Sequence, residues 1–284
     1  MRWNLLPAFI VSSGLVGSPI VPGQSKGVDA GEVLIGELRC AACHEDSAAG
    51  RLARRTAPKL NSVGHRLNPQ FLMRFLANPA EVHPGTKMPD LLTGRSKEER
   101  ANVAEALTHY LVSLSSESKN TMVSDRGRLK EGERLFHEIG CLACHGKDEA
   151  GLGHIQGKYQ PGALSDFLYH PLKVRQSGRM PDFGLSRTEA DDLAAYLATE
   201  EVLDVQPFKP KQTLVEEGSV LFRELNCSAC HSLDGGAQHK MAMPLLEVRS
   251  GRGCLAEKPS GVPDFSLSGK QRKDIAATLG GTRR

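Results

Sequence analysis

The chain has 284 residues, with 36 basic and 33 acidic side chains and a formal charge of +3. This length allows one to three domains. The nearly balanced charge, with no basic stripe, argues against a nucleic-acid-binding protein. Aromatic residues make up 5% of the chain and Trp3 is the only tryptophan, so each polypeptide core is expected to be small.

The N-terminus has the pattern of an export signal. Arg2 precedes an apolar stretch, Leu5 to Val21, and small polar residues follow it. We predict a signal peptide over residues 1–25 and a periplasmic or otherwise exported protein. The alternative is an uncleaved N-terminal anchor, which would be the only membrane association, because no other stretch approaches the ~18 apolar residues of a transmembrane helix.

Three copies of Cys-x-x-Cys-His are the most informative motif. They are Cys40-Ala-Ala-Cys43-His44, Cys141-Leu-Ala-Cys144-His145 and Cys227-Ser-Ala-Cys230-His231. This motif is typical of covalent haem c attachment, in which both thiols form thioethers and the histidine binds iron. We therefore expect three haem c groups, attached through Cys40, Cys43, Cys141, Cys144, Cys227 and Cys230.

Two other uses of Cys-x-x-Cys explain the pattern less well. A zinc ribbon places its second pair about 15–20 residues after the first, whereas the pair after Cys43 begins only at Cys141. A thioredoxin-like redox pair does not require the histidine that follows each copy here. Of the seven cysteines, only Cys254 lies outside the motifs, so no disulfide framework is indicated.

The motifs belong to a longer internal repeat. Gly31, Gly132 and Gly218 lie nine residues before the first motif cysteine, and Ile35, Phe136 and Phe222 lie five residues before it. This spacing predicts a helix that runs into each motif with an apolar residue on a fixed face.

Each repeat also ends in a predicted amphipathic helix. These helices cover 97–114, then 187–197 after the N-cap Ser186, and a last helix after the N-cap Ser268. A further helix is expected over 69–76. No strand-like alternation competes with these patterns, so we predict an all-α fold with linkers at 115–124 and 206–212.

Between the first and last helix of each repeat lie a proline loop and a Pro-Asp segment. The loop prolines are Pro58, Pro161 and Pro244. The Pro-Asp segments are Met88-Pro89-Asp90, Met180-Pro181-Asp182 and Val262-Pro263-Asp264, so the third repeat lacks the methionine.

This order of elements resembles the class I cytochrome c fold. The resemblance implies three tandem cytochrome c-like domains at 28–114, 126–201 and 212–280, the third degenerate; we call these ranges the first, second and third units. It implies His44, His145 and His231 as proximal iron ligands, with a proline-loop carbonyl accepting from the other ring nitrogen; Pro58 and Pro244 fit this role well. Met88 and Met180 are then the distal ligands of the first and second haems.

The third unit has no obvious distal ligand. Val262 cannot bind iron, and Met241, Met243 and His239 lie near the proline loop, on the expected proximal side. Cys254 precedes Val262 and is an alternative thiolate ligand; a free thiol is the simpler interpretation.

These features predict an exported electron-transfer protein that exchanges electrons with redox partner proteins. The alternative is a haem enzyme or a gas or redox sensor, peroxidase-like, with an open five-coordinate third haem. A third interpretation is that the third unit is a decayed module, or that the chain is the front piece of a longer multi-haem protein.

Overall fold

The computed structural model describes residues 29–45, 56–115, 126–146, 152–155, 157–160, 162–176, 178–198, 208–233 and 239–281. The predicted signal peptide and Pro161 lie outside this part of the chain. Within it the structure is helical and has no strand, only three isolated β-bridges, which confirms the all-α prediction. No helix in these ranges is both long and apolar enough to cross a membrane.

The helices follow the repeat. The first unit contains α1 (Ala30–Glu37), α2 (Val63–Arg66), α3 (Pro69–Ala77), α4 (Pro79–Val82) and α5 (Lys97–Ser113). The second contains α6 (Arg126–Glu138), α7 (Ala163–Tyr169), α8 (Pro171–Val174) and α9 (Arg187–Leu197). The third contains α10 (Gln212–Glu224) and α11 (Gly269–Gly281). Short 3₁₀ turns form at the motifs, η1 (Cys40–Ala42), η2 (Cys141–Ala143) and η4 (Cys227–Ala229), and elsewhere, η3 (Leu152–Ile155), η5 (Leu245–Glu247) and η6 (Gly253–Leu255).

The predicted N-caps hold the last helices in place. Ser186 and Glu189 form a capping box on α9, in which each side chain bonds the other residue's backbone amide. Ser96 and Glu99 form the same box on α5, and Ser268 caps α11 through the amide of Gln271. The helix predicted at 69–76 is α3.

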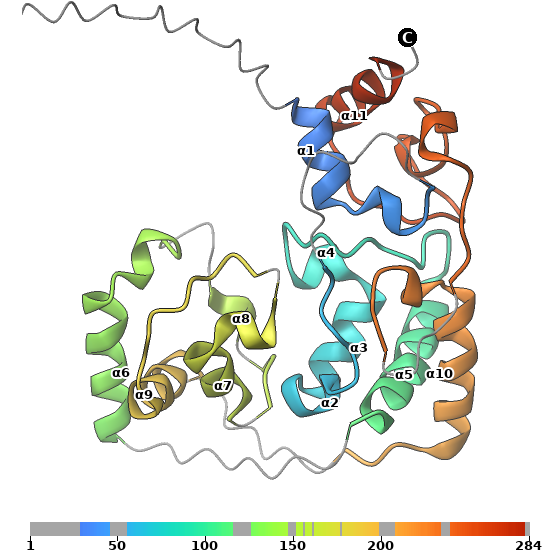
Figure 1. The fold of residues 1–284 in the computed structure, drawn as a ribbon. Coiled ribbons are helices and arrows are strands. Elements are labelled where there is room, and N and C mark those ends of the chain that lie inside the picture. Colours follow the sequence, from blue (N-terminus) through green and yellow to red (C-terminus); the bar gives the residue numbers. More distant parts are fainter. Residues whose placement is uncertain are drawn as a thin grey trace, which may run out of the picture.

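The first helix of each unit packs against a last helix, but not always that of its own unit. In the second unit, α6 packs on α9 (Figure 1). In contrast, α1 of the first unit packs on α11 of the third, and α10 of the third packs on α5 of the first (Figure 1). The first helices of the ranges 28–114 and 212–280 are therefore exchanged, each packing on the last helix of the other range.

Two names describe this exchange. A lead is a first helix with its motif: residues 29–45 are the first lead and 208–233 the third lead. A body is the remainder of the unit: residues 56–115 are the first body and 239–281 the third body. We call the first and third units together the interlaced pair.

The apolar cores follow the exchange. One core joins Phe222 and Cys227 of the third lead to Leu72, Leu92 and Leu107 of the first body. A second core joins the first lead to the third body through residues that include Ile35, Cys40, Leu245, Leu255 and Ile275. The third core lies within the second unit and includes Phe136, Leu164, Leu193, Cys141 and Met180.

The repeated glycines explain how closely the helices cross. A Cβ atom on Gly132 would lie well inside contact distance of the Asp192 carbonyl oxygen on α9. Gly218 lies against the Ala106 carbonyl on α5 in the same way, and Gly31 lies against the Asp274 carbonyl on α11. Only glycine permits this approach of two helix backbones.

The second unit joins the first body through paired backbone segments. Leu67 and Tyr159 form an antiparallel bridge, flanked by a hydrogen bond of 2.8 Å from the Asn68 amide to the Lys158 carbonyl. The Lys158 ammonium lies 5.7 Å from the Phe71 ring centroid, and burial lowers its pKa to about 8. All three cores are therefore parts of one connected structure.

Candidate haem-binding sites

All three motifs adopt one backbone conformation. The residue before the first cysteine is left-handed, with φ of 56° at Arg39, 84° at Gly140 and 57° at Asn226. A 3₁₀ turn follows, and each motif histidine amide donates to the carbonyl of the first cysteine at 2.9 to 3.0 Å. Each motif is thus a rigid turn at the end of a lead helix, as covalent attachment of a planar group requires.

The motif cysteines are available for thioether bonds. All seven cysteines are free thiols in the structure. Burial raises the pKa of the Cys43, Cys141 and Cys230 thiols, and it raises that of Cys227 to about 12. These thiols are therefore uncharged and lie against apolar surroundings, which suits a mostly apolar porphyrin. No cluster of three or more His, Cys, Asp or Glu that could hold a metal ion occurs in the described residues.

Two motif histidines make the expected proximal hydrogen bond, although each makes it to the other unit's body. His231 Nδ1 lies 2.9 Å from the Pro58 carbonyl oxygen of the first body. His44 Nδ1 lies 2.7 Å from the Met243 carbonyl oxygen of the third body, one residue before the predicted Pro244. Donation from Nδ1 leaves Nε2 free to bind iron. Burial also lowers the pKa of His231, which favours the neutral form that metal binding needs.

His145 differs from the other two. Its Nδ1 is buried and has no hydrogen-bond partner among the residues that the structure describes. The loop proline of this unit, Pro161, lies outside those residues. The hydrogen bond through Nδ1 that holds the rings of His44 and His231 is therefore not seen for His145 within the described residues.

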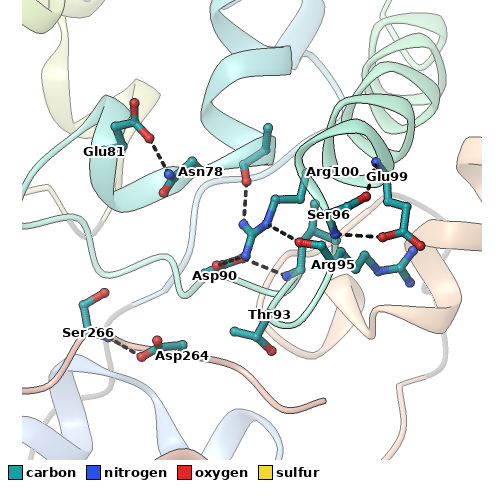
Figure 2. Close-up of polar contacts among 12 residues, drawn as sticks. Asn78, Glu81, Asp90, Thr93, Arg95, Ser96, Glu99, Arg100, Asp264 and Ser266 are labelled. Carbon is teal, nitrogen blue, oxygen red and sulfur yellow. Dashed lines mark hydrogen bonds and ion pairs between the residues drawn. The ribbon is translucent and has the colours of Figure 1, made fainter. Parts of the chain in front are cut away.

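The Met88 segment is fixed to the first body. Asp90 pairs with Arg100 on α5 at 2.8 Å, and Arg100 also donates to the Ala77 carbonyl at 2.9 Å (Figure 2). The Asp90 side chain accepts from the Leu92 amide at 2.8 Å, which closes the turn after Pro89. Met88, partly buried, is thus presented from the same body that supplies Pro58 to His231.

Met180 lies in its own unit. It packs against the core that contains Cys141, Leu164 and Leu193. The Asp182 side chain accepts from the Gly184 amide at 2.9 Å, so the segment after Pro181 turns as the segment after Pro89 does. The second unit therefore brings Cys141 and Met180 to the same core without help from another unit.

The Val262 segment runs beside the Met88 segment. Asp90 and Asp264 exchange two backbone hydrogen bonds, of 2.8 and 2.9 Å, and Thr93 donates to the Val262 carbonyl at 3.1 Å. Met243 contributes its carbonyl on the proximal side, as its place beside the loop predicts, and its side chain is 56% exposed. The thiol of Cys254 is partly buried, and burial raises its pKa.

The first and third motifs touch each other, which sequence reasoning missed. The Arg39 guanidinium donates to the Cys230 carbonyl at 2.5 Å. The side-chain amide nitrogen of Asn226 lies 3.9 Å from Cys43 Sγ and donates to the Lys240 carbonyl at 2.9 Å. The sequence held a signal for this contact: both side chains occupy the left-handed position where the second unit has Gly140, and a larger residue is strained there unless contacts hold it.

Comparisons with known proteins show what the chain is similar to. The family described as "Cytochrome C oxidase, cbb3-type, subunit III" matches residues 127–197, most of the second unit. Cbb3-type cytochrome c oxidase subunit CcoP of Helicobacter pylori (strain 52) is 31% identical over 110 residues, as is CcoP of strain ATCC 700392 / 26695. The match covers 37% of this chain and 37% of each relative. No solved structure matches the chain. The comparisons support a c-type cytochrome with a role in haem c electron transfer.

Proposed function

We propose that the chain is an exported electron-transfer protein that carries three covalent haem c groups. The observation that carries this proposal is the contact between the first and third motifs, through Arg39 and Asn226. Haems attached to touching motifs are neighbours, so an electron can pass between them. Haem c supplies a reversible one-electron couple when bound, and the chain's residues hold, orient and shield it.

Each side chain has a definite task in this proposal. The motif cysteines anchor the porphyrin, and His44, His145 and His231 bind iron from one side. The carbonyls of Met243 and Pro58 fix two of these rings by accepting from Nδ1. Met88 and Met180 would supply thioether sulfur to hold the iron, a ligand that suits haem c to electron transfer.

Export and partners follow from the sequence and from the relatives. The apolar stretch within residues 1–25 supports export, and anchoring by an uncleaved form of it is the alternative. The relatives are named as subunits of an oxidase, so we propose that this chain also exchanges electrons with redox partner proteins. Nucleic acid has no part in this function.

The test is a haem count combined with a redox titration. The full chain, produced in a bacterium that attaches haem c, is expected to carry three haems that survive denaturation and to titrate reversibly. Pairwise Cys→Ser substitution in each motif, such as C141S/C144S, should remove one haem at a time. A denaturation-resistant haem count of zero would refute the proposal.

A haem enzyme or sensor is the second candidate, and the observation that favours it is Val262 in place of a methionine. An iron that lacks this ligand is open to a small molecule on that side. About one equivalent of carbon monoxide bound by the reduced protein, together with peroxide-dependent turnover, would favour this candidate. No binding at any haem would contradict it and leave the electron carrier.

A further inference from the structure

Two of the three haem pockets are composite in this structure. The third lead enters the first body: Phe222 and Cys227 join a core with Leu72 and Leu107, and His231 bonds the Pro58 carbonyl. The Pro58 carbonyl that His231 bonds lies 173 positions earlier in the chain.

The same body also presents Met88. The Asp90–Arg100 pair fixes the Met88 segment to α5, and Leu92, only 2% exposed, joins the core that Cys227 contacts. The third motif and the segment that carries Met88 therefore pack around one core, although sequence order assigns them to different units.

The complementary pocket combines the first lead with the third body. Cys40 contacts the core formed by Leu245, Leu255 and Ile275, and His44 bonds the Met243 carbonyl. The segment that follows in this body leads from Cys254, next to the core residue Leu255, to Val262. This pocket contains no methionine equivalent to Met88.

The side chains that face each other at the helix crossings suit the exchanged pairing of the helices. Phe136 and Tyr196 pack across α6 and α9 with ring centroids 5.6 Å apart. Phe222 and Tyr110 repeat this pair across α10 and α5, at 5.5 Å. The α1–α11 crossing has the smaller residues Ile35 and Thr278 at the same positions.

Pairing within units would break this match. Ile35 would face Tyr110, and Phe222 would face Thr278, so the aromatic pair seen across α6 and α9 would form at neither crossing. The exchange therefore repeats the aromatic pair of the second unit across α10 and α5. Thr278 also donates to Asp29, the N-cap of α1, which ties the first lead to the third body.

We propose that Met88 completes the haem site of the third motif, opposite His231, and that the haem on the first motif, bound by His44, has no methionine ligand. This assignment rests on the proposed function. Under this assignment, the haem without a methionine ligand is attached at the first motif and not at the third. That haem then lies directly beside a methionine-ligated one.

The experiment compares two variants of the full chain, C40S/C43S and C227S/C230S, each carrying two haems. Methionine ligation is counted from the sulfur-to-iron charge-transfer absorption of the oxidised protein, and open sites from carbon monoxide bound by the reduced protein. We expect two methionine-ligated haems and no carbon monoxide in C40S/C43S. We expect one methionine-ligated haem and about one equivalent of carbon monoxide in C227S/C230S.

C141S/C144S is the matched control, since its expected values, one methionine-ligated haem and one open haem, are the same under either pairing. The reverse results in the two test variants, or equal methionine counts in them, would overturn the assignment while leaving the electron-transfer function intact. A haem-free unaltered chain would overturn both, and the haem count alone shows it.

A second measurement requires no variant to fold. In the reduced unaltered protein, the Met88 methyl group should show nuclear Overhauser contacts to the haem bonded to Cys227 and Cys230. Contacts to the haem bonded to Cys40 and Cys43 would overturn the assignment.

Discussion

The second unit and the interlaced pair use the same helix crossing with different partners. In the second unit, Gly132 meets the Asp192 carbonyl of its own α9. In the interlaced pair, Gly218 and Gly31 meet carbonyls of the other unit's last helix. The crossing is therefore a property of the repeated pattern, whereas the partner is selected by residues that differ between repeats.

This difference shows what tandem repeats leave open. Three similar leads and three similar bodies can combine in several ways, and every combination buries similar glycines and apolar residues. Matched pairs such as Phe222 with Tyr110, and contacts between motifs such as Arg39 with Cys230, distinguish one combination from another.

The largest expected effect comes from substitutions at the crossing glycines. Gly132→Ala would force a Cβ against the Asp192 carbonyl and separate α6 from α9, at a cost of about 3 kcal/mol or more in stability. The loss of stability should be detected only at the second haem. Gly218→Ala should instead perturb the methionine-ligated haem of the interlaced pair, as measured by absorption during urea unfolding.

Gly280→Ala is the control for these substitutions. It lies in α11 with open space around the added Cβ, so it should leave stability unchanged or raise it by up to about 1 kcal/mol. If Gly132→Ala and Gly218→Ala changed the stability as little as Gly280→Ala does, the close helix crossings at Gly132 and Gly218 would be contradicted.

Much of this architecture could be predicted from the sequence, because it depends on local signals. The helix at 187–197 and the caps Ser186 and Ser268 were predicted as found, and Ser96 adds an identical box. The exchange could not be predicted, because helix propensity, capping and the nine-residue spacing are the same for every lead. The site was predicted as a set of residues, whereas the pairing of His231 with Pro58 required the structure.

Lowering the pH should reduce the stability of the interlaced pair before it reduces that of the second unit. His109 on α5 is 3% exposed and accepts from the Lys211 amide at 2.9 Å, and burial lowers its pKa. Glu105 lies 4.0 Å from its other nitrogen, and Phe208 stacks on the ring. Because the native pKa is lowered, stability is complete above the ordinary value near 6.5 and is lost as the pH falls toward the native pKa.

The expected loss is about 1–3 kcal/mol, the cost of a protonated His109 ring that is buried and can no longer accept from the Lys211 amide. It is measured by thermal unfolding between pH 7 and pH 5, with His109→Gln as the variant that cannot titrate. A pH dependence that is the same in His109→Gln as in the unaltered chain would contradict this role.

A smaller effect is expected from the aromatic pair across α10 and α5. A double-mutant cycle on Phe222→Leu and Tyr110→Leu should give a coupling of about 0.5–1.5 kcal/mol, as aromatic pairs do. Phe136 and Tyr196 should give a similar value. A coupling between Ile35 and Tyr110, with none between Phe222 and Tyr110, would indicate pairing within units.

The smallest stability effect is expected at Arg39. Arg39→Gly removes the strain of a left-handed non-glycine residue, which should stabilise the protein by about 1 kcal/mol. It also removes the hydrogen bond to the Cys230 carbonyl, which should destabilise the protein by a similar amount. The net change should lie within about 0.5 kcal/mol, while the potentials of the two neighbouring haems shift in a redox titration. Ser266→Gly, at another left-handed residue whose side chain is exposed, is the matched control and should shift neither of these potentials.

The exchange of leads is tested most directly by nuclear Overhauser contacts in the reduced, haem-loaded protein with labelled tyrosine, phenylalanine and isoleucine. The chain has only four tyrosines, so the Tyr110 ring can be assigned from single substitutions. Contacts from Tyr110 to Phe222, with Ile35 methyl groups contacting Thr278, are the predicted result. Contacts from Tyr110 to Ile35, with none to Phe222, would contradict the exchange.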